Sequence, residues 1–144
     1  QQIYLNGENV TAKLREEEVG NMASMCSAVP EVRAQLLELQ RNLAARENVV
    51  MDGRDIGTNI LPNADTKIYL TASVDTRANR RFLELQEKGV DCNLEEIARD
   101  IEERDYRDMH REIAPLRQAE DAVYVDSSNL SIEEVVETIL SHCK

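Results

Sequence analysis

Two kinds of segment alternate along this chain, and their order restricts the fold more than any other feature of the sequence. Short apolar runs rich in β-branched residues occupy Val49–Met51, Lys67–Thr71 and Ala122–Val125. Such runs are typical of strands buried in a parallel sheet. Helical patterns separate them, so the sequence predicts an α/β fold with helices on both faces of a parallel sheet. A sheet of this kind binds ligands at the carboxyl ends of its strands.

Start and stop signals place the helices. Pro30 opens one helix, and Ser73 caps another that stops at Gly89. Capping-box-like sequences begin two more at Asn93 and Ser131, and a further helix is expected over about residues 14–27. The apolar residues at helical spacing in the first two are Val32, Leu36, Leu39 and Leu43, and Val74, Ala78, Phe82 and Leu85. Residues 2–11, which alternate around an Asn-Gly pair, predict a separate antiparallel hairpin.

Composition excludes several classes of protein. A net charge of -11 opposes binding to a phosphate backbone, and four tyrosines with one phenylalanine are too few for base stacking. The apolar runs are too short to cross a bilayer, and the first residues lack the features of a signal peptide. Three widely spaced cysteines suit neither a disulfide framework nor a zinc site. We therefore expect a cytoplasmic protein that binds neither nucleic acid nor membrane.

Charged residues gather at three places. Asp52–Thr58, which follows an apolar run, holds two carboxylates and an arginine between glycines, so it predicts a ligand site at a sheet edge or a turn with a self-paired Arg-Asp. In the helix expected over residues 93–113, Arg104, Asp108 and Arg111 continue the inward apolar stripe. A buried guanidinium needs an anionic partner and suits phosphate or carboxylate, whereas a solvated face is the ordinary alternative.

The third concentration is Arg77, Arg80 and Arg81, on the helix after the Lys67–Thr71 run. A multiply charged anion would relieve their repulsion, and pairing with Glu84 and Glu87 is the alternative. Ser24 and Arg33 carry no comparable signal of their own.

Together these residues resemble the bacterial cytidylate (CMP/dCMP) kinase family over essentially the whole chain. The segments that carry the resemblance are Val49–Thr58, Leu61–Asp65, Arg80-Arg81 with Leu85–Gly89, Glu103–Asp108 with Arg111 and Ala114–Leu116, and Ile3–Thr11 with Glu17–Val19. The resemblance implies transfer of the ATP γ-phosphoryl group to CMP or dCMP with Mg²⁺. It implies a P-loop nucleoside-monophosphate-kinase fold and a monomer. The expected parts are a monophosphate-binding insert over 1–28, a core over 29–73, a lid with flanking helices over 74–112, and a C-terminal core strand and helix over 113–144.

The resemblance also implies roles for individual residues. Ser24, Arg33 and Asp55 would hold the cytosine, because its amine needs an acceptor and its O2 and N3 need donors. Arg104, Asp108 and Arg111 would meet the monophosphate and ribose, and Arg54 the phosphate region. Arg77, Arg80 and Arg81 would close over ATP as lid arginines. Arg104, Arg111 and Arg80 are the residues expected to assist catalysis, and none is expected to bind a metal ion.

The chain departs from the family in one respect, because none of its five glycines lies in a G-x-x-x-x-G-K-[ST] loop for ATP phosphates. The resemblance places a first strand between Val49–Met51 and Lys67–Thr71, which this sequence does not contain. We therefore expect a fragment that alone has little or no kinase activity. The alternatives are a non-catalytic cytidine-nucleotide-binding module, an assembly half that acts with a P-loop-containing chain, and a UMP/CMP kinase.

Overall fold

The computed structural model describes residues 2–143, and these form a mixed α/β structure with a small parallel sheet. In chain order the elements are β1 (Tyr4–Leu5), β2 (Glu8–Asn9), a 3₁₀ turn (Lys13–Arg15), α1 (Glu17–Cys26), α2 (Pro30–Ala44), a π-helical turn (Ile56–Ile60), β3 (Ile68–Thr71), α3 (Val74–Glu87), α4 (Leu94–His110), β4 (Val123–Asp126) and α5 (Ile132–His142). No helix of residues 2–143 combines the length and apolarity needed to cross a bilayer.

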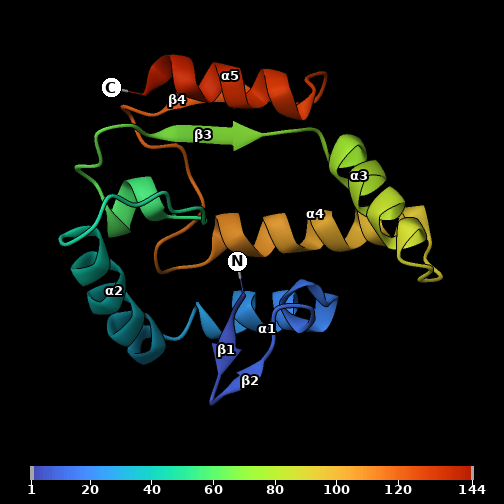
Figure 1. Ribbon diagram of the computed structural model, residues 1–144, viewed down its shortest axis with the longest axis horizontal. Coiled ribbons are helices and arrows are strands. Elements are labelled where there is room, and N and C mark those ends of the chain that lie inside the picture. The colour runs from blue at the N-terminus through green and yellow to red at the C-terminus, as the bar shows by residue number, and fades with distance from the viewer. Residues whose placement is uncertain (1, 144) are drawn as a thin grey trace.

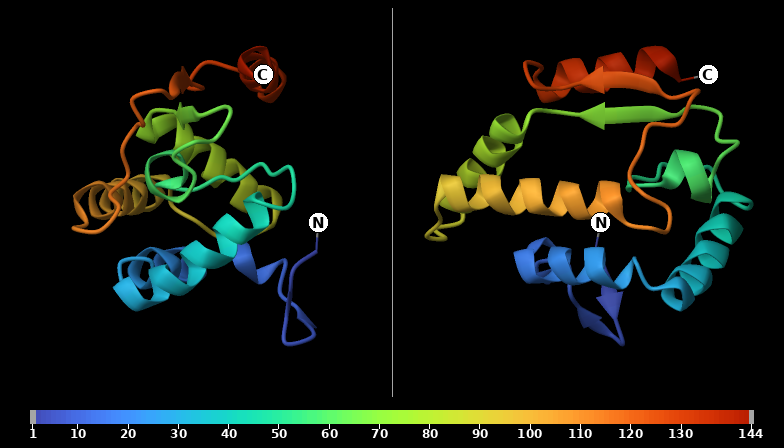
Figure 2. Two further views of the ribbon diagram at one scale, coloured as in Figure 1. Left: turned by 90° about the vertical axis from the view of Figure 1, so that its left-hand side faces the viewer. Right: turned by 180° about the vertical axis from the view of Figure 1, so that it is seen from behind.

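Helix α4 runs through the middle of the structure (Figure 1). The β3–β4 sheet and α5 lie on one side of α4, and α1 with the β1–β2 hairpin lies on the other. Figure 2 shows the same arrangement from behind and from the side. Helices α3 and α4 pack closely against each other, and both belong to the connection from β3 to β4. The C-terminal half of α4 contacts α1 and the segment before the π-helical turn, which lie far from it in the sequence, because Ser24 and Arg54 both donate to Asp108.

Strands β3 and β4 confirm two of the three predicted strands. They pair in parallel, with Ile68 opposite Val123 and Thr71 opposite Asp126. Val125 on β4 is among the few buried apolar side chains of residues 2–143, together with Ile60, Ala72, Ala78 and Ile97. This small core lies around the sheet and the α3–α4 pair.

The predicted strand Val49–Met51 is wrong, because this segment has no regular secondary structure. A strand is maintained by hydrogen bonds to a neighbouring strand, and no strand of the described residues pairs with this segment. The side chain of Val50 is accordingly fully exposed. Asp52–Thr58 therefore does not follow a strand, contrary to the sequence-based expectation.

The local sequence signals predicted the turns and the helix ends correctly. Asn6 and Gly7 have φ angles of 51° and 86°, the left-handed conformation that a two-residue hairpin turn requires. The hydroxyl of Ser73 accepts from Thr76 N at the start of α3, and Ser131 forms a capping box at the start of α5. Gly89 ends α3 with a φ of 70°.

Helix α2 forms where Pro30 predicts it, but its apolar stripe is not buried by the described residues. Its four spaced apolar side chains are between 38% and 66% exposed. One end of α2 is nevertheless anchored, because Arg41 donates to the carbonyl oxygens of Asn59 and Ile60 at 2.8 and 3.0 Å. This contact joins α2 to the π-helical turn and so to the site described below.

The cap of α4 provides a test of the fold. Asn93 Oδ1 accepts from the backbone N–H groups of Glu95 and Glu96 at 2.8 and 3.1 Å. We expect Asn93→Ala to lower the free energy of unfolding by about 1 kcal/mol, because two N–H groups lose their acceptor. Asn93→Asp keeps an acceptor and is the matched control. Urea denaturation followed by circular dichroism measures both, and equal losses in the two variants would contradict the capping role.

Candidate functional site

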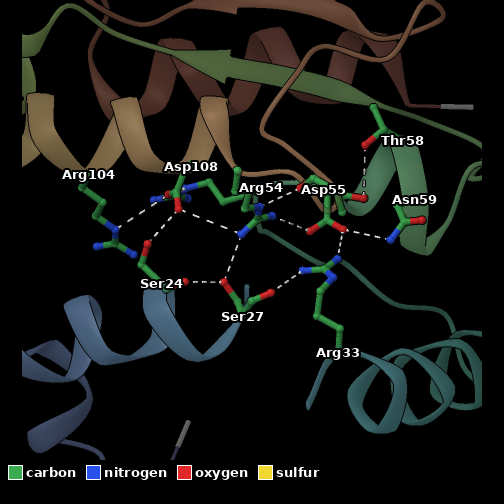
Figure 3. A network of polar contacts seen from close by, with 11 residues as sticks. Ser24, Ser27, Arg33, Arg54, Asp55, Thr58, Asn59, Arg104 and Asp108 are labelled. Atoms are coloured by element: carbon green, nitrogen blue, oxygen red, sulfur yellow. Dashed lines mark hydrogen bonds and ion pairs between the residues drawn. The ribbon is translucent and has the colours of Figure 1, made fainter. Parts of the chain in front are cut away.

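A network of charged and polar side chains lies between the C-terminal half of α4, the α1–α2 junction and the π-helical turn (Figure 3). We call it the Asp55–Asp108 cluster. Its members are Ser24, Ser27, Arg33, Arg54, Asp55, Asn59, Arg104, Asp108 and Arg111. All seven residues that the sequence assigned to CMP lie in this cluster, although they come from four separate segments. The cluster does not lie at the carboxyl ends of β3 and β4, where the sheet pattern predicted a ligand.

Asp55 is the centre of one half of the cluster. Its side chain is almost completely buried, and its carboxylate pairs with Arg33 and, at 3.4 Å, with Arg111 Nη2. Asn59 Nδ2 donates to it at 3.2 Å. The π-helical turn holds the backbone in place, because the N–H groups of Asn59 and Ile60 both donate to the Asp55 carbonyl. A buried carboxylate requires such partners, since an unpaired charge is costly away from water.

Asp108 is the centre of the other half. It is 2% exposed and projects from α4 toward α1. Ser24 Oγ donates to its Oδ1 at 2.8 Å, and Arg54 Nε donates to its Oδ2 at 3.0 Å. Arg111 Nη1 lies 4.0 Å from Oδ1 and connects this half to Asp55.

Arg104 is the member with unused hydrogen-bonding capacity. Its Nε is buried, lies 4.0 Å from Asp108 Oδ2 and has no hydrogen-bond partner among residues 2–143. The guanidinium lies against α1, where a Cβ on Gly20 would be 3.2 Å from Nη1. Burial, followed by the positive charge of Arg54, lowers the pKa of Arg104 below its ordinary value, although an arginine remains protonated. The site therefore offers an N–H group and a positive charge to an anion.

The balance of charge in the cluster supports the same conclusion. Four arginines face two aspartates, which leaves a net charge of +2 in a chain whose total is -11. Concentrated positive charge at a partly buried site attracts small, multiply charged anions.

Arg111 reaches the cluster in a way that the helical pattern did not predict. Helix α4 ends at His110 rather than near Ile113, and Arg111 has extended backbone angles, φ -63° and ψ 144°. Its side chain turns inward because Nε donates to the carbonyl of Ala114 at 2.8 Å and Nη1 donates to Ser27 Oγ at 3.0 Å. Of the two alternatives that the sequence left open for Arg111, an inward position and a solvated face, the structure shows the inward one, and its cause is the turn after the helix.

Two members of the cluster, Ser27 and Asn59, were missed by the sequence analysis. Ser27 follows Ser24 by three residues and Asn59 follows Asp55 by four. Each therefore lies about one helical turn from a residue that the sequence assigned to CMP. That spacing was the available signal.

A comparison with known proteins identifies the family. The sequence model described as Cytidylate kinase matches residues 1–144. The chain belongs to the cytidylate kinase family. Similar proteins include the cytidylate kinases of Caldicellulosiruptor bescii, which is 52% identical over 97% of this chain, and of Lactobacillus johnsonii, 50% identical over 96%. A cytidylate kinase of Streptococcus pneumoniae is 50% identical over 96%. The chain spans 60% to 62% of the length of these relatives.

The three arginines expected in the lid of a cytidylate kinase lie outside the Asp55–Asp108 cluster. Arg77 pairs with Asp105 at 2.6 Å and donates to the carbonyl of Ala72. Arg80 donates to the carbonyl of Ser127 at 2.6 Å, at the carboxyl end of β4. Arg81 bonds to Glu84 and, at 2.7 Å, to the carbonyl of Arg15. A role of these side chains toward ATP stays a prediction.

Glu84, the partner of Arg81, should make the stability of the protein depend on pH. Hydrogen bonds from Lys88, Arg15 and Arg81 lower the pKa of Glu84 from 4.5 to about 2. The folded state therefore favours the ionised carboxylate, and its stabilisation is present at neutral pH and lost as the pH falls through 4.5 toward about 2. We expect Glu84→Gln to be less stable than the unmodified protein at neutral pH, with a difference that shrinks on acidification.

Thermal unfolding of both proteins across this pH range measures the effect. Glu87→Gln is the matched control, because Glu87 is exposed on the same helix and no ion pair to it is found within residues 2–143. A difference between Glu84→Gln and the unmodified protein that does not vary with pH would contradict the lowered pKa of Glu84.

Proposed function

We propose that the complete protein is a cytidylate kinase, which transfers the γ-phosphoryl group of ATP to CMP or dCMP. The products are ADP and CDP or dCDP. Sequence identity of about 50% to cytidylate kinases supports this activity, as does the excess positive charge of the cluster. We also propose the P-loop nucleoside-monophosphate-kinase fold, with an insert over 1–28, core over 29–73 and 113–144, and lid over 74–112. The protein would act as a cytoplasmic monomer.

The buried pair of Asp55 and Arg33 supports cytosine as the base. The carboxylate of Asp55 would accept from the exocyclic amine, and Arg33 with Ser24 would donate to O2 and N3, with Ser24 exchanging its hydrogen bond to Asp108 for one to the base. Uracil has a carbonyl at the same position, which would face the carboxylate unfavourably. Because Asp55 is held by Arg33, Arg111 and Asn59 before any ligand binds, its oxygens are already oriented.

The unpartnered Nε of Arg104 is the observation that carries the proposal for the phosphate. A monophosphate supplies acceptor oxygens and negative charge beyond what Asp108 and Asp55 give to Arg104, Arg54 and Arg111. Asp108 holds Arg54 directly and lies near the other two guanidinium groups. We propose that it also receives hydroxyl groups of the ribose.

Phosphoryl transfer depends on alignment of the two substrates and on neutralisation of charge, so no covalent intermediate with the protein is required. Arg104 and Arg111 would hold the accepting phosphate in position, and Arg80 would approach the transferred group. In the structure Arg77, Arg80 and Arg81 are bonded to Asp105, Ser127 and Glu84. These arginines would exchange those partners for ATP oxygens when a lid closes and excludes water.

Mg²⁺ is expected to accompany ATP. Within residues 2–143, no three acidic, histidine or cysteine side chains lie where they could hold a metal ion together. Asp55 and Asp108 are both engaged by arginine. We propose that the ion arrives with the ATP phosphates.

The first test combines the activity with the base. The complete protein should phosphorylate CMP with ATP much faster than UMP, in a coupled assay of ADP release. Asp55→Ala should lower kcat/KM for CMP by roughly 10- to 100-fold, because a hydrogen bond to a charged group is lost. The CMP-to-UMP ratio should also fall, which partial unfolding would not produce. CMP binding without turnover would refute the kinase proposal, and an unchanged ratio in Asp55→Ala would refute the base-reading role.

The second test concerns the phosphate. Arg104→Ala should lower kcat/KM for CMP by roughly 100- to 1,000-fold, because a donor aimed at developing charge is removed. Arg104→Lys should be intermediate, since it keeps the charge and loses the planar donor group. Arg99→Ala, on an exposed position of the same helix, is the matched control and should retain activity. Equal effects of Arg104→Ala and Arg99→Ala would exclude a contact between Arg104 and the substrate.

A further inference from the structure

We propose that Ser27 is a positioning residue that fixes the guanidinium of Arg111 relative to that of Arg33. Its two oxygen atoms would set the spacing between the part of the site that reads the base and the part that holds the phosphate. This inference rests on the proposed function and assigns to that site a residue that touches neither substrate.

Two separate oxygen atoms of Ser27 hold the two arginines. The hydroxyl oxygen accepts from Arg111 Nη1 at 3.0 Å, and the carbonyl oxygen accepts from Arg33 Nη1 at 3.1 Å. Asp55 binds the opposite ends of the same guanidinium groups, through Arg33 Nη2 and Arg111 Nη2. Ser27, Arg33, Asp55 and Arg111 thus form a closed ring of contacts, and Figure 3 labels the first three of these residues.

The orientation of the Ser27 hydroxyl is determined by a third contact. Ser27 Oγ donates its one proton to the carbonyl of Ser24 at 2.8 Å. A hydroxyl has a single proton and two lone pairs, so the lone pairs remain for the guanidinium of Arg111. Since Ser24 itself donates to Asp108 at 2.8 Å, Ser27 also connects the two halves of the cluster.

The backbone of Ser27 lies in a short, well-bonded turn. Ser27 follows the last residue of α1 as its C-cap, and its N–H donates to the carbonyl of Ala23 at 3.0 Å. The N–H of Val29 donates to the carbonyl of Cys26, and Pro30 then begins α2 with a fixed φ. The α1–α2 junction therefore determines where both oxygens of Ser27 point.

The hydroxyl matters to Arg111 more than to Arg33. Without it, Arg111 keeps one short hydrogen bond, from Nε to Ala114, and a long contact of 3.4 Å to Asp55. Arg33 keeps its partners, because a backbone carbonyl is present with any side chain at position 27. Removal of the hydroxyl should therefore loosen the guanidinium of Arg111, which is proposed to hold the phosphate. Selection of the base through Asp55 and Arg33 should be unchanged.

Steady-state kinetics of Ser27→Ala in the complete protein tests this directly. We expect KM for CMP to rise about 3- to 10-fold, with KM for ATP and the CMP-to-UMP ratio unchanged. Ser27→Thr restores a hydroxyl and should return KM for CMP to within about twofold of the original value. Ser141→Ala is the matched control, because Ser141 Oγ donates to the carbonyl of Thr138, three residues earlier, at 2.7 Å and lies far from the cluster on α5.

Several results would overturn the proposal. These are an unchanged KM for CMP in Ser27→Ala, no recovery in Ser27→Thr, or parallel changes in KM for CMP and ATP. A matching effect of Ser141→Ala would also overturn it, since both serines lose the same bond to a helix carbonyl.

A double-mutant cycle on stability separates this inference from the proposed function. Without nucleotide, the double variant Ser27→Ala/Arg111→Ala should lose less stability than the sum of the two single variants. A second cycle replaces Arg111→Ala with Arg111→Lys, which keeps the positive charge, and should give the same result. Additive losses with both partners would show that the hydroxyl does not hold Arg111. If the original protein fails to phosphorylate CMP, the proposed function fails while the cycle still tests the contact.

Discussion

The burial of two carboxylates, Asp55 and Asp108, is the constraint on which the arrangement of this chain depends. Neither can be buried without positive partners, and those partners come from α2, from the segment before the π-helical turn and from the end of α4. The apolar core of the described residues is small, so it does not by itself hold these segments together. The cluster that forms the candidate site also connects the two sides of α4.

The pairing of buried aspartates with a larger number of arginines explains why the site suits an anion. The arginines of the cluster outnumber its aspartates, and burial leaves Arg104 Nε without an acceptor among the residues that the structure describes. In a purely structural ion-pair network, the positive and negative charges are expected to balance. Here the N–H of Arg104 Nε is unused, and the carboxylate of Asp55 is held in a fixed orientation. The same surplus also makes positioning important, because like charges separate unless neutral groups such as Ser27 hold them.

Local structure followed from local sequence with few exceptions. The Asn6-Gly7 turn, the caps at Ser73, Asn93 and Ser131 and the stop at Gly89 depend on neighbouring residues alone, and each was predicted. Val49–Met51 was predicted wrongly because a strand depends on a partner, and no pattern within the segment specifies one. The apolar stripe of α2 predicted a helix correctly but could not reveal whether another segment covers it.

The sequence by itself determined membership of the family and predicted which residues carry the chemistry, since the family motifs contain Asp55, Arg104, Asp108 and Arg111 in recognisable order. It did not determine that Ser27 joins Arg33 to Arg111, nor that Arg80 and Arg81 lie away from the cluster. Residue type and spacing encode conformation over about one helical turn, and motifs encode membership of a family. Contacts between residues 27 and 111 depend on how whole helices pack, so only the tertiary structure decided them.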